Sequence, residues 1–300
     1  MAEVNSAPSG CGFVYVATGA HYVAEARVSA ATLRAAMPDA RIALVTDVAI
    51  ADPDGLFTLV IVRTPVRRQP IDKLLAWEAP FERCIFLDTD THISGDLSEL
   101  FDLLDEFDLA ATTETLRGLH YSLPGVPGAF SEFNTGVIAF RRNSAVAAFF
   151  QSWREDYERL HASHGFVSDQ PAFRWAAFRS AVRIAPLPSE YHFLTLTPNY
   201  VMWQVRLLHG RGDLPALARD LNQRLGARAY VPGLGPVAGY QGRKYWLRQL
   251  VCLLSRGLRM ALGRSPYASS PVPDHWTQEE KTLTAARTQP AASAPPRQHP

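Results

Sequence analysis

Two aspartates follow an apolar segment of the chain. Residues 83–91 read Arg-Cys-Ile-Phe-Leu-Asp-Thr-Asp-Thr, so Asp88 and Asp90 lie two residues apart and share one face of an extended chain. The apolar residues before them are typical of a buried strand in a parallel sheet, and open α/β sheets bind ligands at the carboxyl ends of such strands. Two adjacent carboxylates repel each other unless a cation lies between them. Mg2+ or Mn2+ carrying a diphosphate would meet this need, because both ions accept oxygen ligands.

Two further segments could contribute sugar-binding groups. In residues 132–140, Asn134 offers both hydrogen-bond donors and an acceptor, and Gly136 would let another group approach the following apolar strand closely. At the start of an expected helix, Asp169 and Gln170 could face a sugar ring. Each segment also has an ordinary structural interpretation, as a turn before a buried strand and as a helix cap.

A histidine after a third apolar segment could complete a metal site. His209 is followed by Gly210 and, two residues later, by Gly212. An imidazole beside two carboxylates would favour Mn2+ over Mg2+, and the glycines would let backbone amides approach phosphate oxygens. The alternative is a structural or solvent-facing histidine.

The elements that must position these residues alternate along the chain. Strand signals followed by helix signals predict an α/β fold with a mainly parallel sheet and helices on both faces. The expected strands are residues 13–17, 41–45, 59–62, 83–87, 109–112, 136–140 and 203–208. The expected helices are residues 23–37, 72–78, 143–160, 169–178 and 214–225.

Composition divides the chain into four parts. We expect a disordered N-terminus over residues 1–10, one catalytic domain over 11–238, a basic amphipathic helix over 239–264 and a disordered tail rich in Pro and Ala over 265–300. Within that helix, residues 243–264 carry six basic side chains and no acidic one. It could pack on the domain or lie on an anionic membrane.

The bulk properties exclude several classes of protein. A formal net charge of +1 argues against broad nucleic-acid binding, which requires a basic face. The three cysteines are widely spaced and odd in number, which argues against a disulfide framework and favours a reducing compartment. The first ten residues lack the apolar core of a signal peptide, and no apolar run is long enough to span a membrane. We therefore expect a cytoplasmic protein, with residues 243–264 as the candidate contact with the inner face of the membrane.

Six short motifs together resemble a known family. The chain is similar to the GT-A-fold glycosyltransferases of family 8, which include glycogenin and bacterial lipopolysaccharide galactosyltransferases, and the similarity covers residues 12 to 225. The order and spacing of the motifs carry it more than any one of them. The matching motifs are Val14–Gly19, Lys73-Leu74, Phe86–Asp90, Phe133–Gly136, Ser168–Gln170 and Leu208–Gly210.

The resemblance implies a Rossmann-like GT-A domain and a role for each matching residue. Asp88 would contact the ribose and the metal, Asp90 would bind the metal more directly, and His209 would be the third protein ligand. Asp169 and Gln170 would line the donor sugar and are the expected catalytic residues. The residues expected to bind the nucleotide-sugar donor are Ala17, Thr18, Gly19, Asp47, Lys73, Asp88, Asn134, Gly210 and Arg211.

The implied reaction is metal-dependent transfer of a sugar from a nucleotide-diphospho-sugar, with UDP as the expected nucleotide. The acceptor would be a saccharide, a lipid or a protein, and residues 116–130 are a candidate flap over it. The family retains the anomeric configuration. We favour attack from the same face as the leaving group; the alternative is a covalent intermediate on Asp169.

One departure and two alternatives remain. The family usually has a lysine that contacts phosphate just after the late His-Gly, whereas this chain has Arg211, whose guanidinium also binds phosphate. A haloacid-dehalogenase-like phosphatase also places Asp-x-Asp at a strand end, but normally on the first strand and with Thr or Val where this chain has His92. A non-catalytic sugar-nucleotide-binding protein is the second alternative.

Overall fold

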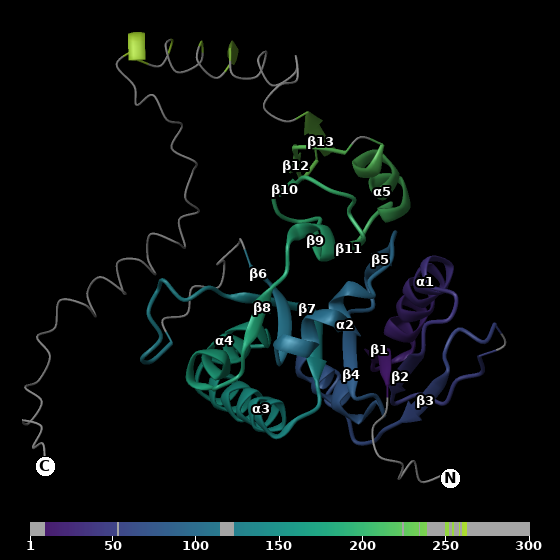
Figure 1. Cartoon of the computed structure of the whole chain (residues 1–300). Coiled ribbons are helices and arrows are strands. Elements are labelled where there is room, and N and C mark those ends of the chain that lie inside the picture. Colours follow the sequence, from purple (N-terminus) through teal and green to yellow (C-terminus); the bar gives the residue numbers. More distant parts are fainter. Residues whose placement is uncertain are drawn as a thin grey trace, which may run out of the picture. The chain divides into compact units, whose positions relative to one another are not determined.

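The computed structural model describes residues 10–52, 54–114, 123–223, 225–233, 235–238, 250, 251, 254, 258 and 260–262. The chain divides into two units, residues 1–240 and 241–300. Figure 1 labels the helices and strands of the larger unit. The larger unit contains, in chain order, β1 (Cys11–Ala17), α1 (Ala20–Ala36), β2 (Ile42–Thr46), β3 (Leu59–Val62), the 3₁₀ helix η1 (Pro70–Glu78), β4 (Arg83–Leu87), β5 (Thr91–Ile93), α2 (Glu99–Glu106), β6 (Leu109–Thr113), β7 (Phe133–Arg141), α3 (Ser144–His164), α4 (Gln170–Arg179), β8 (Ile184–Pro186), the 3₁₀ turn η2 (Ser189–Tyr191), β9 (Phe193–Leu194), β10 (Asn199–Val201), β11 (Leu207–His209), α5 (Leu214–Asn222), β12 (Arg228–Val231) and β13 (Gly235–Ala238).

The central sheet has helices on both faces. On one face the side chains of Val14, Phe86 and Phe140 pack with η1, α3 and α4, which contribute a group of aromatic rings around Trp153. On the other face Tyr15 and its neighbours pack with α1 and α2. Because alternate residues of each strand enter opposite cores, β1, β2 and β4 are apolar almost throughout. The predicted α/β class, with a mainly parallel sheet flanked by helices, is confirmed.

The order of the strands explains why one sheet edge collects the polar residues. The order is β3-β2-β1-β4-β7-β6-β8, and β7 runs antiparallel to both of its neighbours, whereas the other pairs are parallel. The carboxyl ends of β1, β2 and β4 therefore meet the amino end of β7. In that register Leu87 pairs with Val137, and the amide of Asp88 donates to the carbonyl of Gly136 at 2.8 Å.

A bulge in β7 lies at the same edge. Ala111 of β6 pairs with Ile138, whereas the next residue, Thr112, pairs with Asn134. Residues 135–137 are thus left out of the pairing with β6, while Val137 stays paired with Leu87 at the end of β4. Bulges of this kind re-aim side chains and commonly occur beside functional sites.

Two small sheets complete the larger unit. In the first, β11 lies between β5, to which it is antiparallel, and β9, to which it is parallel. The second joins β10, β12 and β13 in antiparallel pairs. The β5-β11-β9 sheet matters most for the site, because β5 begins one residue after Asp90 and β11 ends at His209.

The structure corrects several predicted element boundaries. The strand expected over 203–208 covers only Leu207–His209, because the amides of Met202 and Trp203 turn to donate to the Glu190 carboxylate. The segment expected as a short helix over 72–78 is a 3₁₀ helix that starts earlier, at Pro70. Helix α2 was not predicted at all; its eight residues are too few to give a clear helical period. Helix α5 ends at Asn222, not at residue 225.

The smaller unit contains most of the predicted basic helix, and much of that helix lies outside the described residues. Residues 250, 251, 254, 258, 260 and 261 are helical, and Leu250, Leu254 and Leu258 are exposed. Within the described parts of the chain, no helix is both long and apolar enough to cross a membrane. Residues 1–9 of the predicted disordered N-terminus, the predicted tail over 265–300 and residues 116–122 of the candidate flap also lie outside the described residues, whereas residues 123–130 of the flap are described.

Asp108 joins three elements at the opposite end of the sheet. Its Oδ1 accepts hydrogen bonds from the guanidinium of Arg141 at 2.9 and 3.1 Å and from Asn143 at 2.8 Å, and its Oδ2 accepts from the amide of Arg183 at 2.9 Å. Burial works to raise the pKa of Asp108, but the Arg183 amide and the Arg141 and Asn143 side chains outweigh it and lower that pKa.

We predict that Asp108→Asn destabilises the fold by about 1–3 kcal/mol, measured by urea unfolding at pH 7. The folded state depresses this pKa, so the wild type keeps its advantage above the ordinary Asp value and loses it as the pH falls below about 4. The difference between the two proteins should therefore narrow in acid. The exposed Asp39→Asn is the control, and equal stability of wild type and Asp108→Asn at pH 7 would contradict the prediction.

Candidate functional site

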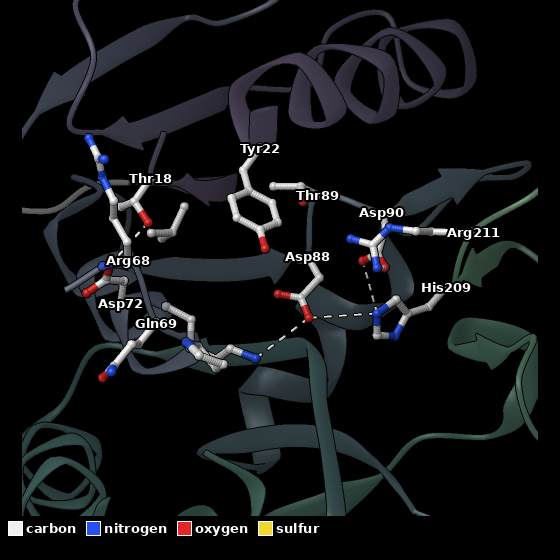
Figure 2. Close-up of a pocket in the computed structure, with 13 residues that line it drawn as sticks. Thr18, Tyr22, Arg68, Gln69, Asp72, Asp88, Thr89, Asp90, His209 and Arg211 are labelled. Carbon is white, nitrogen blue, oxygen red and sulfur yellow. Dashed lines mark hydrogen bonds and ion pairs between the residues drawn. The ribbon is translucent and has the colours of Figure 1, made fainter. Parts of the chain in front are cut away.

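A pocket of about 240 Å³ opens at the sheet edge described above (Figure 2). Its walls come from the ends of β1 and β4, from α1, from the segment leading into η1 and from the turn after β11. The residues that line it are Val16, Thr18, Tyr22, Arg68, Gln69, Pro70, Asp72, Lys73, Asp88, Thr89, Asp90, His209 and Arg211. Six of the predicted site residues are among them: Thr18, Lys73, Asp88, Asp90, His209 and Arg211.

Asp88, Asp90 and His209 form a group that fits a divalent cation. Figure 2 shows their side chains pointing toward one another. The Nε2 atom of His209 lies 3.2 Å from Oδ1 of Asp90 and 3.7 Å from Oδ2 of Asp88, and one ligand atom from each residue lies within 4.8 Å of the others. Adjacent ligands of an octahedral ion are about 3 Å apart at Mg2+–oxygen bond lengths. The two carboxylates and the imidazole therefore have both the spacing and the ligand atoms that one such ion requires.

The small β5-β11-β9 sheet brings the histidine to the aspartates. His209 pairs with Thr91 of β5 and with Leu194 of β9. The amide of Gly210 then donates to the carbonyl of Asp90 at 2.9 Å. Backbone hydrogen bonds thus join residues that are more than a hundred positions apart in the sequence.

The imidazole of His209 is also enclosed by its neighbours. A side chain at Gly136 would overlap the ring, so the bulge of β7 can approach it only because this residue is glycine. The Nδ1 atom of His209 lies 2.9 Å from Nε2 of His192, whose side chain is fully buried. Burial, followed by the nearby His209 and Lys73, holds the pKa of His192 well below its ordinary value.

Lys73 connects the metal ligands to a second carboxylate. Its ammonium lies 3.6 Å from Oδ2 of Asp88 and 3.5 Å from Oδ1 of Asp169, and it donates to Oγ1 of Thr135 at 3.0 Å. Burial works to lower the pKa of Lys73, but Asp169 and Asp88 outweigh it and raise that pKa. The buried lysine is therefore a fixed positive charge at the inner end of the pocket.

Asp169 is buried at 3% exposure, just before α4. Burial raises the pKa of Asp169 against the opposing charge of Lys73. Its Oδ2 atom is buried and has no hydrogen-bond partner among the described residues, although Asp169 precedes a helix whose amides it could have capped. A buried carboxylate oxygen without a partner is costly and indicates an acceptor held ready for a ligand.

The opposite end of the pocket is built on Asp72. Its carboxylate accepts from Oγ1 of Thr18 at 3.1 Å and from the amide of Arg68 at 2.7 Å. These bonds hold Arg68 at a φ of 55° on the rim of the pocket. Its guanidinium donates to Oδ2 of Asp47 at 2.9 and 3.0 Å, and the amide of Gly19 donates to Oδ1 of Asp47 at 2.6 Å.

Asp47 is thus beside Gly19, as predicted, but its two oxygens are already engaged by protein donors. Burial works to raise the pKa of Asp47, and the Gly19 amide and the Arg68 guanidinium outweigh it and lower that pKa. A ribose could reach this carboxylate only by sharing or displacing Arg68. The guanidinium of Arg68 is therefore more accessible to a ligand than the carboxylate of Asp47.

Arg211 occupies the mouth of the pocket. Its guanidinium lies 3.6 Å from Oδ2 of Asp90 and donates to the Glu25 carboxylate of α1 at 3.1 and 3.3 Å. Burial works to raise the pKa of Asp90, but His209 and Arg211 outweigh it and lower that pKa. Asp90 is therefore ionised and ready to act as a ligand.

Seven predicted site residues are not among those that line the pocket: Gly19, Asp47 and Asp169, whose contacts are given above, and Ala17, Asn134, Gln170 and Gly210. Ala17 packs in the core at 0% exposure. Asn134 donates to Glu114 at 2.8 Å and accepts from the amide of Gly136 at 2.9 Å, so it shapes the bulge. Gly210 already donates its amide to Asp90, and a side chain there would overlap Thr195. Gln170 is the first residue of α4 and is not among the residues that line the pocket.

The structure adds pocket residues that the motifs did not indicate. Tyr22, which is 44% exposed, projects from α1 into the pocket, and Arg68 and Gln69 line the walls (Figure 2). A signal existed for Arg68, because a pair of arginines precedes Pro70 in a segment that leads to Lys73. Nothing in the sequence distinguishes Tyr22 from the other aromatic residues.

Comparison with known proteins gives structural similarity at low sequence identity. No protein-family model matches the sequence, and no curated protein matches it significantly. The galactosyltransferase LgtC in complex with donor and acceptor sugar analogs is 16% identical, with a TM-score of 0.47 over 67% of this chain and 87% of that one. The glycosyltransferase GlyE of Streptococcus pneumoniae TIGR4 is 16% identical, with a TM-score of 0.47 over 67% of this chain and 55% of that one. Mouse xyloside xylosyltransferase 1 is 12% identical, with a TM-score of 0.43 over 68% and 98%.

The chain thus resembles glycosyltransferases of known structure, as its motifs predict. At TM-scores below 0.5 this resemblance adds nothing about the chemistry. What the site does has to follow from its own residues.

We predict that Gly136→Ala weakens Mn2+ binding at least about tenfold, because the added methyl group displaces the His209 ring that it would overlap. Free Mn2+ can be counted by electron paramagnetic resonance during a titration. The matched control is Gly128→Ala, where a methyl group would meet no described atom within 4 Å. Equal Mn2+ affinity in Gly136→Ala and wild type would contradict the geometry derived above.

Proposed function

We propose that this chain is a metal-dependent hexosyltransferase that moves a sugar from a nucleotide-diphospho-sugar, a UDP-sugar, to a saccharide, lipid or protein acceptor. One observation carries the proposal. A two-carboxylate, one-imidazole cation site lies at the carboxyl ends of parallel strands, and a buried lysine joins it to a buried aspartate with an unpaired oxygen. Such a pocket combines a place for a diphosphate with a place for a polyhydroxylated group.

The diphosphate would lie between the cation site and the basic side chains. Asp88, Asp90 and His209 would hold Mn2+ or Mg2+, with the imidazole favouring Mn2+. A bound divalent cation supplies positive charge where the leaving diphosphate becomes more negative. Lys73 and Arg211 add fixed positive charges on either side of that position, and a preorganised charge costs no reorganisation during the reaction.

The donor sugar would lie beside Asp169. The unpaired Oδ2 atom of this carboxylate can accept a hydrogen bond from a sugar hydroxyl, while Lys73 holds its Oδ1 atom. We assign Asp169, with Gln170 beside it, to the catalytic part of the site. Because Asp169 is committed to Lys73, we favour same-face attack with retention, in which the departing phosphate oxygen takes the acceptor's proton, over a covalent intermediate on Asp169.

The nucleoside would occupy the end of the pocket between α1 and η1. The half-exposed ring of Tyr22 offers a face on which a base can stack, and Thr18 and Arg68 supply a hydroxyl and a guanidinium nearby. The backbone of the Ala17–Gly19 turn passes the same end. We take the nucleotide to be uridine from the family resemblance of the motifs.

The charge of the chain and the composition of residues 243–264 bear on whether it binds nucleic acid or a membrane. A net charge of +1 argues against broad nucleic-acid binding. We propose that the protein acts in the cytoplasm, and that residues 243–264 contact the inner face of the membrane through exposed leucines such as Leu254 and through their basic side chains. A phosphatase would instead need Asp88 as a free nucleophile, and here Asp88 lies after the fourth strand and close to both Lys73 and His209.

We predict that UDP raises the melting temperature of the wild type in Mn2+ and that a chelator removes most of the rise, because ligand binding stabilises the folded state by mass action. Asp90→Asn should lose the Mn2+-dependent part, since it removes one charge of the cation site. The control is Asp102→Asn on an exposed position of α2. An unchanged Mn2+-dependent shift in Asp90→Asn would contradict the site. No shift with any nucleotide, together with hydrolysis of a phosphate ester, would favour the phosphatase.

A second prediction separates the sugar-binding end from the nucleotide-binding end. Asp169→Asn should keep the UDP affinity within a few-fold of the wild type but lower turnover of the UDP-sugar by about a hundredfold or more. The substitution preserves shape while removing the charge that faces Lys73. Calorimetry with UDP and a coupled assay for UDP release measure the two quantities, and full turnover in Asp169→Asn would exclude a catalytic part for this residue.

A further inference from the structure

His192 lies directly behind the proposed metal ligand His209. It follows the 3₁₀ turn η2 and precedes β9, and its side chain is 0% exposed. Its Nε2 atom is 2.9 Å from the Nδ1 atom of His209, and the two rings are inclined by 23° with centroids 5.1 Å apart. The other ring nitrogen of His209, Nε2, faces Asp88 and Asp90.

This contact constrains which nitrogen of His209 can bind a metal ion. A neutral imidazole has one donor nitrogen and one acceptor nitrogen. If Nδ1 of His209 carries the hydrogen and donates it to Nε2 of His192, the Nε2 lone pair of His209 is directed at the carboxylates. Metal-bound histidines commonly donate their second ring N–H to a fixed acceptor in this way.

The rest of the surroundings fixes the backbone and one face of the His209 ring but does not choose the tautomer. The carbonyl of His209 accepts from the amide and the hydroxyl of Thr195, and Gly136 packs against the ring. Neither contact is a hydrogen bond to Nδ1. Among the described residues, His192 is the group that lies within hydrogen-bond distance of that atom.

A purely structural role explains His192 poorly. Its own Nδ1 atom is buried and has no hydrogen-bond partner in the described part of the protein. An apolar side chain of similar size would fill the same space without leaving a buried polar atom unpaired, which is costly. The chain accepts this cost at a side chain whose one polar contact among the described residues is with a proposed metal ligand.

We propose that His192 is a positioning residue for the metal site: it accepts the Nδ1–H of His209, and so orients the imidazole and leaves Nε2 of His209 free to bind the cation. The inference rests on the metal site of the proposed function and extends it to a residue outside the pocket lining. It assigns a role to the contact between the turn after η2 and the end of β11.

Two substitutions of similar size separate acceptor chemistry from packing. His192→Gln places a side-chain amide whose oxygen can accept from His209, whereas His192→Met fills similar space with a thioether, a weak acceptor. We expect His192→Met to weaken Mn2+ binding by about 10- to 100-fold and His192→Gln to remain within about threefold of the wild type, as measured by electron paramagnetic resonance. The control is His161→Phe, which removes a histidine hydrogen bond on α3, away from the pocket.

A measurement on the wild type makes the test independent of how the variants fold. Long-range nitrogen–proton NMR spectra of the protein loaded with Mg2+ should show the hydrogen of His209 on Nδ1. A hydrogen on Nε2 in the loaded protein, or equal Mn2+ affinity in His192→Met and wild type, or equal loss in His192→Gln and His192→Met, would overturn the inference. A wild type that binds no Mn2+ would overturn the metal site itself and the inference with it, whereas Mn2+ binding without any UDP binding would count against the proposed function alone.

Discussion

The repulsion between buried or half-buried carboxylates is the constraint on which the rest of this structure depends. Asp88, Asp90 and Asp169 are brought to one end of a sheet, where they would repel one another without cationic neighbours. The ammonium of Lys73 lies within 3.6 Å of the carboxylates of Asp88 and Asp169. The Nε2 atom of His209 lies within 3.7 Å of the carboxylates of Asp88 and Asp90. Lys73 compensates Asp88 and Asp169, and Arg211 compensates Asp90, at distances of 3.5 to 3.6 Å that leave carboxylate oxygens available to a ligand. Because negative charge remains on these carboxylates, the pocket can bind a cation together with an anionic ligand.

The fold provides the compensation through two unusual connections. The reversed strand β7 brings its amino end beside the carboxyl end of β4, and its bulge puts Thr135 against Lys73 and Gly136 against His209. The three short strands β5, β11 and β9 then join the segment after Asp90 to the segment before Gly210. A conventional, wholly parallel sheet would supply neither contact. The site therefore depends on short elements at the edge of the main sheet as much as on the sheet itself.

Strand β4, which leads to Asp88, was predicted with its observed bounds, but the shortest elements were hard to predict. Long segments with a clear period, such as α1 and α3, were found from the sequence with small errors at their ends. The three-residue strands β5 and β11 and the helix α2 are too short for a period to emerge, and their pairing is decided by distant partners. Among the site residues, the motifs brought out Lys73, Asp88, Asp90 and His209 but not Arg68. They missed Tyr22, which is distinguished only by its place on the wall of the pocket.

The sequence by itself determined the class of fold and the chemical types available, because apolar strands alternate with helices and carboxylates at a strand end require a cation. Only the tertiary structure decided which of those groups act together. The motifs predict Asn134 and Gly210 as ligand-binding residues, yet the Asn134 side chain and the Gly210 amide make hydrogen bonds within the protein. His192 has no motif, yet it lies at 2.9 Å from His209. The physical reason is that hydrogen-bond partners are set by distances between residues far apart in the chain, and local spacing does not carry that information.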